Sequence, residues 1–308
     1  MAPARDMLGW PISFEARYGR GLDRTVCLGG GGLYFIAWQV GYLQTAALGG
    51  VDFKLAERVV GTSAGSVVAT ALTGGRIGRL HGQVSALSRF PPLLRALAPA
   101  VTLRPSQQRA VDEFVAASDA ESETVKSIGR AALAAVTPDP VRLRANLQMV
   151  LQANTWPSPV LHITCVDTYT GERCVITETA GIRPSRAAAA SSAVPGLFPP
   201  QPIADRKCMD GGVSGSGLHL DVLAGAGRVL ILGLSDGTTI TEAGMTEKVG
   251  TIEDELAALK DSGTLAYLRV PADVDREKLM SVEVVPQALQ DGARQAEIDL
   301  PELREFWA

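Results

Sequence analysis

The chain has 308 residues, with 29 Lys and Arg against 33 Asp and Glu and a formal net charge of −4. Hydrophobic residues make up 46% of it and charged residues 20%, which is ordinary for a globular protein. An acidic balance without a block of Lys and Arg argues against nucleic-acid binding, and no apolar run approaches the roughly 18 residues of a membrane-spanning helix.

Two strand–loop–helix units follow one another near the start of the chain. Residues 25–28 are β-prone and end in the four glycines 29–32, and residues 33–47 read as a mostly apolar helix. Residues 58–60 predict a second strand, which leads through another glycine-containing loop into a helix of small residues over 66–72. Successive units of this kind predict a parallel sheet with crossover helices.

The middle of the chain predicts several helices and one hairpin. Residues 80–152 are rich in Ala, Leu, Arg and Glu and are divided by prolines, which indicates a helical insertion or cap. Residues 161–166 and 174–177 alternate around a glycine-containing turn, as in a β-hairpin. This hairpin places Cys165 opposite Cys174. A cross-strand disulfide is possible there, but two reduced thiols are favoured in a cytoplasmic protein.

The last part of the chain predicts a strand followed by helices. Residues 183–194 predict an Ala-rich helix, residues 209–212 a sharp turn and residues 228–234 (RVLILGL) a buried strand. Residues 240–308 predict a C-terminal helical part. Three prolines punctuate it: Pro271, Pro286 and Pro301. We expect one catalytic domain over residues 1–308, because this length suits a single core with an insertion.

The sharpest motif is the G-x-S-x-G of residues 61–65 (GTSAG), between a predicted strand and a predicted helix. In this context the serine, Ser63, sits on a strained turn at a helix N-terminus, where the helix dipole favours developing negative charge. The alternative is a serine that only caps the helix. The strand before it and the helix after it favour a nucleophile.

The glycine run Gly29–Gly32 also lies between a strand and a helix. Without Cβ atoms, its backbone N–H groups can point one way, as in an oxyanion hole or a phosphate cradle. A nucleotide site is the weaker interpretation, because the run is not G-x-G-x-x-G and no Lys-Ser/Thr follows it. A turn without any ligand is the remaining alternative.

Asp210, followed by two glycines, could be a rigidly held general base. By itself, however, Asp-Gly is first of all a turn sequence. His219 follows Asp210, so the Ser…Asp…His order of α/β-hydrolases is formally available. His81 and His162 have no partner motif, and we predict that they are structural or exposed.

In this order, the three motifs resemble those of the patatin-like phospholipases. Three further stretches fit the same family: residues 37–43 (AWQVGYL), 167–172 (DTYTGE) and 190–200 (ASSAVPGLFPP). The resemblance covers about residues 24–235. It implies an α/β protein with a three-layer α/β/α fold around a central, mostly parallel sheet, and the activity of a lipid acyl hydrolase with a Ser–Asp dyad.

Carried over to this sequence, the resemblance makes Ser63 the nucleophile and Asp210 its base. The backbone N–H groups of Gly30, Gly31 and Gly32 would form the oxyanion hole. The reaction implied is ester hydrolysis through an acyl-enzyme, with neither a metal nor another cofactor.

The chain departs from the family pattern after the glycine run. The family usually reads G-G-G-x-[RK]-G, whereas Tyr34 and Phe35 stand at the last two positions here. The basic residue that could hold a lipid phosphate is therefore missing. The apolar pair could line an acyl pocket or pack on the sheet. The Asn-x-Pro that often follows the aspartate is replaced by residues 214–218 (SGSGL).

The expected partner is a lipid or another acyl-ester substrate, in the cytoplasm or at the periphery of a membrane. Residues 85–97 (SALSRFPPLLRAL) could make a transient membrane-surface contact or form a cap packed on the core. Two alternatives remain: an α/β-hydrolase-type esterase with a Ser63–Asp–His219 triad, and a catalytically degenerate lipid-binding protein. The sequence gives neither the head-group preference nor the oligomeric state.

Overall fold

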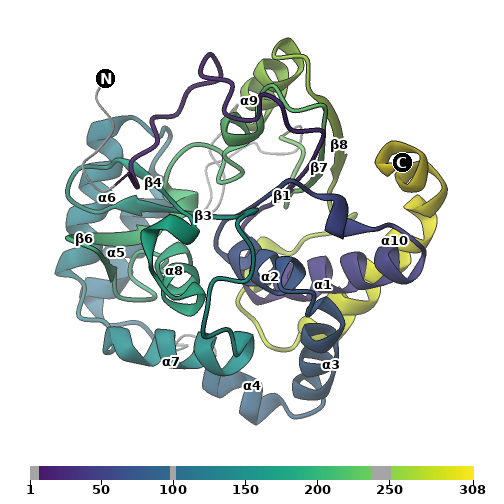
Figure 1. Cartoon of the computed structure of the whole chain (residues 1–308). Helices are drawn as coiled ribbons and strands as arrows, with labels where there is room; N and C mark the ends of the chain where they lie inside the picture. The colour runs from purple at the N-terminus through teal and green to yellow at the C-terminus, as the bar shows by residue number, and fades with distance from the viewer. Residues whose placement is uncertain (1–6, 98–101, 238–250) are drawn as a thin grey trace.

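A sheet lies at the centre of the structure, and helices cover both of its faces (Figure 1). The computed structural model describes residues 7–97, 102–237 and 251–308. In this part of the chain the strands are β1 (Arg24–Leu28), β2 (Arg58–Gly61), β3 (Leu161–Asp167), β4 (Arg173–Ile176), β5 (Gln201–Ile203), β6 (Arg206–Asp210), β7 (Arg228–Leu232) and β8 (Leu265–Arg269). Their order is β5-β6-β3-β2-β1-β7-β8, with β4 paired to β3. The pairs between β3, β2, β1, β7 and β8 are parallel, whereas β4, β5 and β6 add antiparallel pairs.

The helices form a layer on each face of the sheet. They are α1 (Gly32–Leu48), α2 (Ala64–Thr73), α3 (Ile77–Ser88), α4 (Pro91–Leu97), α5 (Pro105–Ala116), α6 (Ser122–Ala134), α7 (Pro140–Leu151), α8 (Pro184–Ser191), α9 (Thr251–Asp261) and α10 (Val285–Trp307). The core under α1, α2, α8 and α10 takes Val26 and Leu28 from β1, whereas Cys27 between them enters the core under α9. Successive strand residues point to opposite faces, so the chain forms three α/β/α layers.

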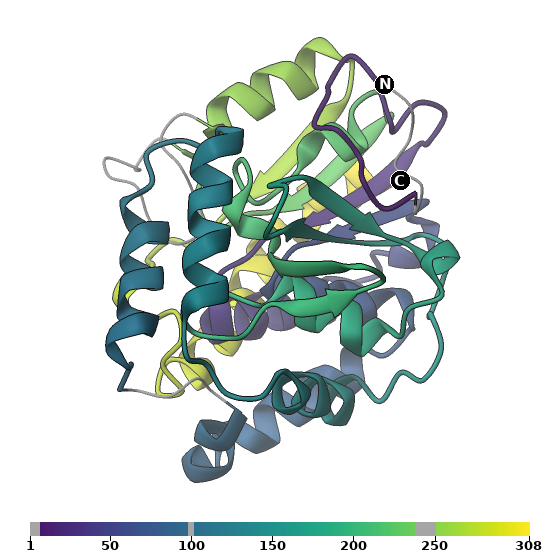
Figure 2. The same cartoon turned by 90° about the vertical axis from the view of Figure 1, so that its left-hand side faces the viewer.

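The long helices near the two chain ends pack together. α10 runs along α1 (Figure 1), and the Tyr42 hydroxyl donates a hydrogen bond of 2.9 Å to the Asp299 carboxylate between them. On the other face, α5 and α6 lie next to each other and cover β3 and β6 through Phe114 and Ile128 (Figure 2). α10 thereby fixes α1, whose N-terminus follows the glycine run.

Most of the predicted elements are present. Both early units form, and their helices begin at Gly32 and Ala64, slightly earlier than expected. The described residues of the predicted insertion over 80–152 form helices joined by loops, and the hairpin pairs Cys165 directly with Cys174. None of the four cysteines forms a disulfide, and all four are described residues.

Three details differ from the prediction. The C-terminal part also contains the edge strand β8. Four of its five residues are at least partly exposed, so it lacks the apolar run that marks a buried strand. Pro301 lies inside α10 at an exposed position, where the buried Leu303 and Trp307 hold the helix against the core. Strands β5 and β6 were not predicted: Asp210 ends β6, and the turn begins at Gly211, two residues later than expected. Residues 240–250 of the predicted helical part lie outside the described residues.

No helix within the described ranges is long and apolar enough to cross a membrane.

Candidate active site

Ser63 lies in the turn between β2 and α2, beside the glycine loop that follows the neighbouring strand β1. Its backbone has φ 51° and ψ −118°, a conformation that is strained for a residue with a side chain. The residue stands at the N-cap position of α2, but its side chain makes no capping hydrogen bond. Since the hydroxyl does not cap the helix, it is available for chemistry.

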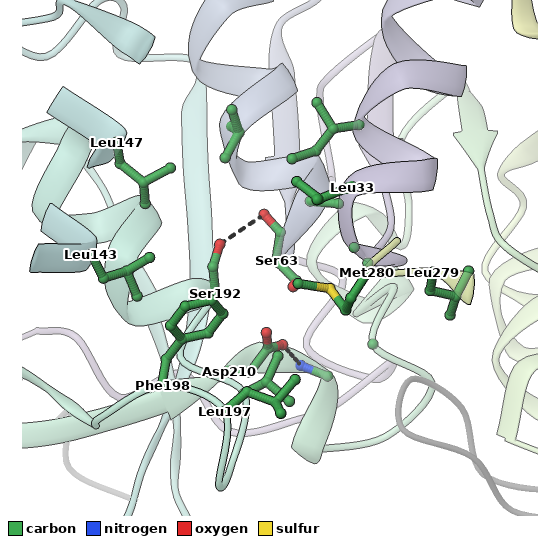
Figure 3. A pocket seen from close by; sticks show the side chains of 18 residues that line it. Leu33, Ser63, Leu143, Leu147, Ser192, Leu197, Phe198, Asp210, Leu279 and Met280 are labelled. Carbon is green, nitrogen blue, oxygen red and sulfur yellow. Dashed lines mark hydrogen bonds between the residues drawn. The ribbon is translucent and has the colours of Figure 1, made fainter. Parts of the chain in front are cut away.

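Hydrogen bonds from other segments hold the Ser63 backbone in this conformation. Its N–H donates to Ser191 Oγ at 2.8 Å. In addition, Ser192 Oγ, drawn in Figure 3, donates to the Ser63 carbonyl at 3.3 Å. The next turn is tied to the first glycine loop, because Gly65 N–H donates to the Gly29 carbonyl at 3.1 Å. The strained turn is thus fixed from both α8 and β1, as a strained residue requires.

Asp210, at the end of β6, faces Ser63 across a pocket (Figure 3). It is only 3% exposed. Its Oδ1 accepts a hydrogen bond of 2.8 Å from Gly212 N–H, whereas Oδ2 has no hydrogen-bond partner among the described residues. Burial raises the pKa of Asp210 from 3.8 to about 7, although the Ser63 hydroxyl and Gly212 N–H act in the opposite direction. Such a carboxylate is a stronger base than an exposed aspartate.

The glycine loop borders the same pocket. Gly30 and Gly32 line it, and a Cβ added to Gly30 would lie 3.2 Å from Ser63 Cβ. Gly32 has φ 63°, which favours glycine. Within the described ranges, the N–H groups of Gly30, Gly31 and Gly32 have no hydrogen-bond acceptor, although Gly31 does not line the pocket. Free amides beside a serine hydroxyl can bind an oxyanion.

The space at the pocket, counted together with open solvent at its mouth, is about 890 Å³. Its apolar walls include Leu33, Ile36, Val67, Leu143, Leu147, Val194, Leu197, Phe198, Leu279 and Met280. No Lys, Arg or His is among its described lining residues. In Figure 3, Leu143 and Leu147 of α7 stand on one side of Ser63, opposite Leu33 and Met280.

Neither Tyr34 nor Phe35 lines the pocket, so of the two alternatives for this pair the structure favours packing. Phe35 is fully buried and stacks on Trp38, with 5.5 Å between the ring centroids. The Tyr34 hydroxyl donates to the Asp273 carbonyl at 3.1 Å. Both point away from the pocket because they lie on other faces of α1, whereas Leu33 and Ile36, one helical turn apart, line it.

The sequence motifs missed three groups at the site. Ser191 and Ser192 lie in the stretch over residues 190–200, but their roles depend on the packing of α8 against the Ser63 turn. The Ala64 N–H, directly after the serine, also lacks an acceptor within the described ranges. The position after a G-x-S-x-G serine is a known oxyanion-hole donor, which was the available signal for Ala64.

His219 does not line the pocket, and its ring is hydrogen-bonded to the backbone. It is 1% exposed, and its Nε2 lies 3.0 Å from the Gly211 carbonyl oxygen, with which it shares a hydrogen bond. Burial, with a further contribution from Arg173, lowers the pKa of His219 to about 4. A neutral imidazole that bonds to a backbone carbonyl and has such a low pKa is poorly suited to take a serine proton.

One group of residues in the described part of the chain has the spacing of metal ligands. The sulfur atoms of Cys165, Cys174 and Cys208 lie within 4.8 Å of one another and are buried. None of them lines the pocket. Hydrogen bonding to the other two thiols, together with burial, raises the pKa of Cys165, and metal binding would need thiolates.

The fold and this geometry define an α/β/α protein whose serine turn, glycine loop and buried aspartate meet at one apolar pocket. A sequence profile of one family, described as patatin-like phospholipase, matches residues 26–223. The chain belongs to this family, which assigns it to the lipid acyl hydrolases.

Two solved structures are similar to the chain. VipD from Legionella pneumophila has 15% sequence identity and a TM-score of 0.43, over 98% of this chain and 69% of VipD. The type III effector protein ExoU has 21% identity and a TM-score of 0.34, over 90% of this chain and 53% of ExoU, so the chain spans about half of that protein. No curated protein sequence matches the chain.

Proposed function

We propose that the protein hydrolyses acyl esters of lipids through an acyl-enzyme, with Ser63 as nucleophile and Asp210 as its base. The observation that carries the proposal is the buried Asp210 carboxylate, whose Oδ2 has no other partner among the described residues and which faces the Ser63 hydroxyl. A serine hydroxyl needs an adjacent base to become nucleophilic, and this carboxylate supplies one.

In the proposed reaction, Asp210 takes the hydroxyl proton while Ser63 Oγ attacks the ester carbonyl carbon. The free N–H groups of Gly30, Gly31 and Gly32 then hold the oxyanion. The leaving alcohol receives the proton from Asp210 as the C–O bond breaks. Water attacks the acyl-enzyme with Asp210 again as base, which releases the fatty acid and restores Ser63.

The lining of the pocket supports an acyl chain as the bound group. Its walls are apolar side chains, and burying each methylene of a chain contributes about 0.8 kcal/mol. We therefore expect kcat/KM for p-nitrophenyl esters to rise with acyl-chain length until the pocket is filled.

The decisive experiment is labelling with a fluorophosphonate probe, combined with turnover of a p-nitrophenyl ester. Wild type should be labelled and active, whereas Ser63→Ala should lose both the label and at least about 10³-fold in kcat. Ser122→Ala is the control, because it removes an exposed serine hydroxyl at the start of α6 that does not line the pocket. It should keep the label.

Two outcomes would favour the alternatives. Wild-type protein that is folded but takes no label would support a degenerate lipid-binding protein. Near-complete loss of turnover in His219→Ala, with the protein still folded, would replace the dyad by a triad. We expect His219→Ala to retain turnover because its imidazole bonds to the Gly211 carbonyl.

A further inference from the structure

A second depression, of about 1080 Å³ and open to solvent, lies between α7 and the start of α8. The two helices pack side by side (Figure 1). Three of the residues that line it are arginines: Arg144 on α7, and Arg183 and Arg186 at the start of α8. A hydrogen bond of 2.7 Å from Ser185 Oγ to Gln148 Oε1 joins the two walls, so the depression is preformed.

The three guanidinium groups are not neutralised within the described part of the chain. None of them forms a salt bridge there. Arg186 Nε donates to the Pro202 carbonyl at 2.7 Å, which positions this group without cancelling its charge. The buried Arg144 Nε has no acceptor among the described residues. Three unpaired cations at one depression indicate a site for an anion.

The start of α8 adds to the positive potential. Pro184 is the first residue of the helix, the first turn contains no acidic residue, and the Ser185 N–H has no acceptor within the described ranges. The positive end of the helix dipole therefore faces the same side as Arg183, which stands at the N-cap position.

α7 separates this depression from the catalytic pocket. Leu143 and Leu147 line the pocket, whereas Arg144 and Gln148, one position further along, line the depression. The pocket has no basic lining residue among those described, and the family's basic residue after the glycine run is replaced by Tyr34. The pocket therefore offers no positive charge to an anionic ligand, whereas the depression on the other side of α7 does.

We propose that Arg144, Arg183 and Arg186 form a binding site for a phosphate group. Guanidinium groups bind phosphate oxygens with paired, charge-assisted hydrogen bonds, and a helix N-terminus accepts the same ligand. A lipid head group and free phosphate present this chemistry equally. The site does not depend on the proposed catalysis.

The test compares two variants of equal charge. In the first, Arg144, Arg183 and Arg186 are all replaced by Gln. In the control, the exposed Arg109, Arg130 and Arg142, which do not line the depression, are replaced by Gln. Binding is measured by calorimetry with inorganic phosphate, and by cosedimentation with vesicles of ether-linked phosphatidylcholine with and without ether-linked phosphatidic acid. Ether lipids contain no ester for the protein to hydrolyse.

We expect the first variant to lose at least about tenfold in affinity for the phosphate-bearing probe, and the control to change by less than about twofold. Binding of inorganic phosphate would identify a site for free phosphate, whereas binding only to phosphatidic acid vesicles would identify a lipid head-group site. Equal losses in both variants, or no binding by wild type, would overturn the proposal.

A milder variant guards against misfolding. Arg183→Glu changes one exposed side chain. It should weaken phosphate binding by at least the average contribution of one arginine to the loss seen in the triple variant. Turnover of a short p-nitrophenyl ester should be unchanged in every arginine variant. The two proposals therefore fail separately. Turnover by wild type tests the proposed catalysis, and phosphate binding by the arginine variants tests the phosphate site.

Discussion

Ser63 and Asp210 each carry an unfavourable feature. A backbone conformation such as that of Ser63 costs about 1–3 kcal/mol and persists only where neighbours determine it, as the hydrogen bond to Ser191 Oγ does here. Asp210 keeps a carboxyl group in a buried place with one oxygen unpaired among the described residues. Neither feature helps folding, so both point to chemistry.

The pKa of Asp210 predicts the pH dependence of turnover. Only the ionised carboxylate can accept the Ser63 proton, and burial raises its pKa to about 7. With an uncharged ester, kcat/KM should therefore rise about tenfold per pH unit below about pH 7 and level off above it. A plateau that already begins near about pH 5 would show that Asp210 is not the base or is not effectively buried.

Asp210→Asn should stabilise the protein while abolishing turnover. Between pH 3.8 and about 7 the folded state keeps a proton that the unfolded state has lost, so the free energy of unfolding falls as pH rises through this window. Asparagine escapes this loss, so the variant should be more stable by about 2–4 kcal/mol at about pH 8, and by much less near about pH 4.

Urea denaturation at the two pH values measures this effect. The control is Asp261→Asn, an exposed aspartate at the end of α9 whose substitution should change the stability little at either pH. Equal stability of Asp210→Asn and wild type at the higher pH would contradict the burial of a charged Asp210.

At the scale of elements, the contact between the Ser63 turn and β1 predicts a large effect at Gly65. A Cβ there would lie 1.9 Å from the Leu28 carbonyl oxygen, which is backbone and cannot move without disturbing the sheet. Gly65→Ala should therefore destabilise the protein by more than about 3 kcal/mol. The control is Gly82→Ala at an exposed position of α3, where the added Cβ meets nothing within 4 Å. It should stabilise by about 0.5–1 kcal/mol.

Thermal or urea unfolding of the two variants checks the pair. A Gly65→Ala protein as stable as Gly82→Ala would mean that β1 and α2 do not approach as closely as described.

The elements that the sequence predicted well are those with local signals. The strand–glycine loop–helix units and the Cys165–Cys174 hairpin are fixed by residues close together in the chain. The lining of the pocket was not predictable in the same way, because α1 is apolar on nearly all sides. Without an apolar stripe, nothing in the sequence shows that Leu33 and Ile36 face the pocket while Phe35 faces the core.

At the scale of the whole molecule, the candidate site depends on long-range strand pairing. Asp210 reaches Ser63 because β6 pairs antiparallel with β3, which places Asp210 opposite Cys165, while β3 itself pairs with β2. Motif order suggested that the two residues meet, but the register that brings them together is set by contacts between segments far apart in the chain. The arginine depression between α7 and α8 has the same origin. That residues 1–308 form a single catalytic domain stays a prediction.

The segment over residues 85–97 has one buried and two exposed large apolar side chains. Leu94 is buried, as in a cap packed on the core, whereas Phe90 and Leu93 are 63% and 54% exposed. Exposed large apolar side chains next to basic residues are typical of a surface that enters a lipid interface. We infer that Phe90 and Leu93 insert into the surface of a membrane that supplies the substrate.

Replacing both Phe90 and Leu93 by Ser should lower hydrolysis of ester phospholipids in vesicles by about five- to tenfold, because each side chain gains part of its roughly 1.5–3 kcal/mol of burial on insertion. Turnover of a soluble p-nitrophenyl ester should stay unchanged, since neither residue lines the pocket. The control is Leu48→Ser together with Ile298→Ser, which removes two apolar side chains that are 79% and 73% exposed on α1 and α10. An equal loss in both double variants would show that general surface hydrophobicity, and not this segment, brings the protein to lipid.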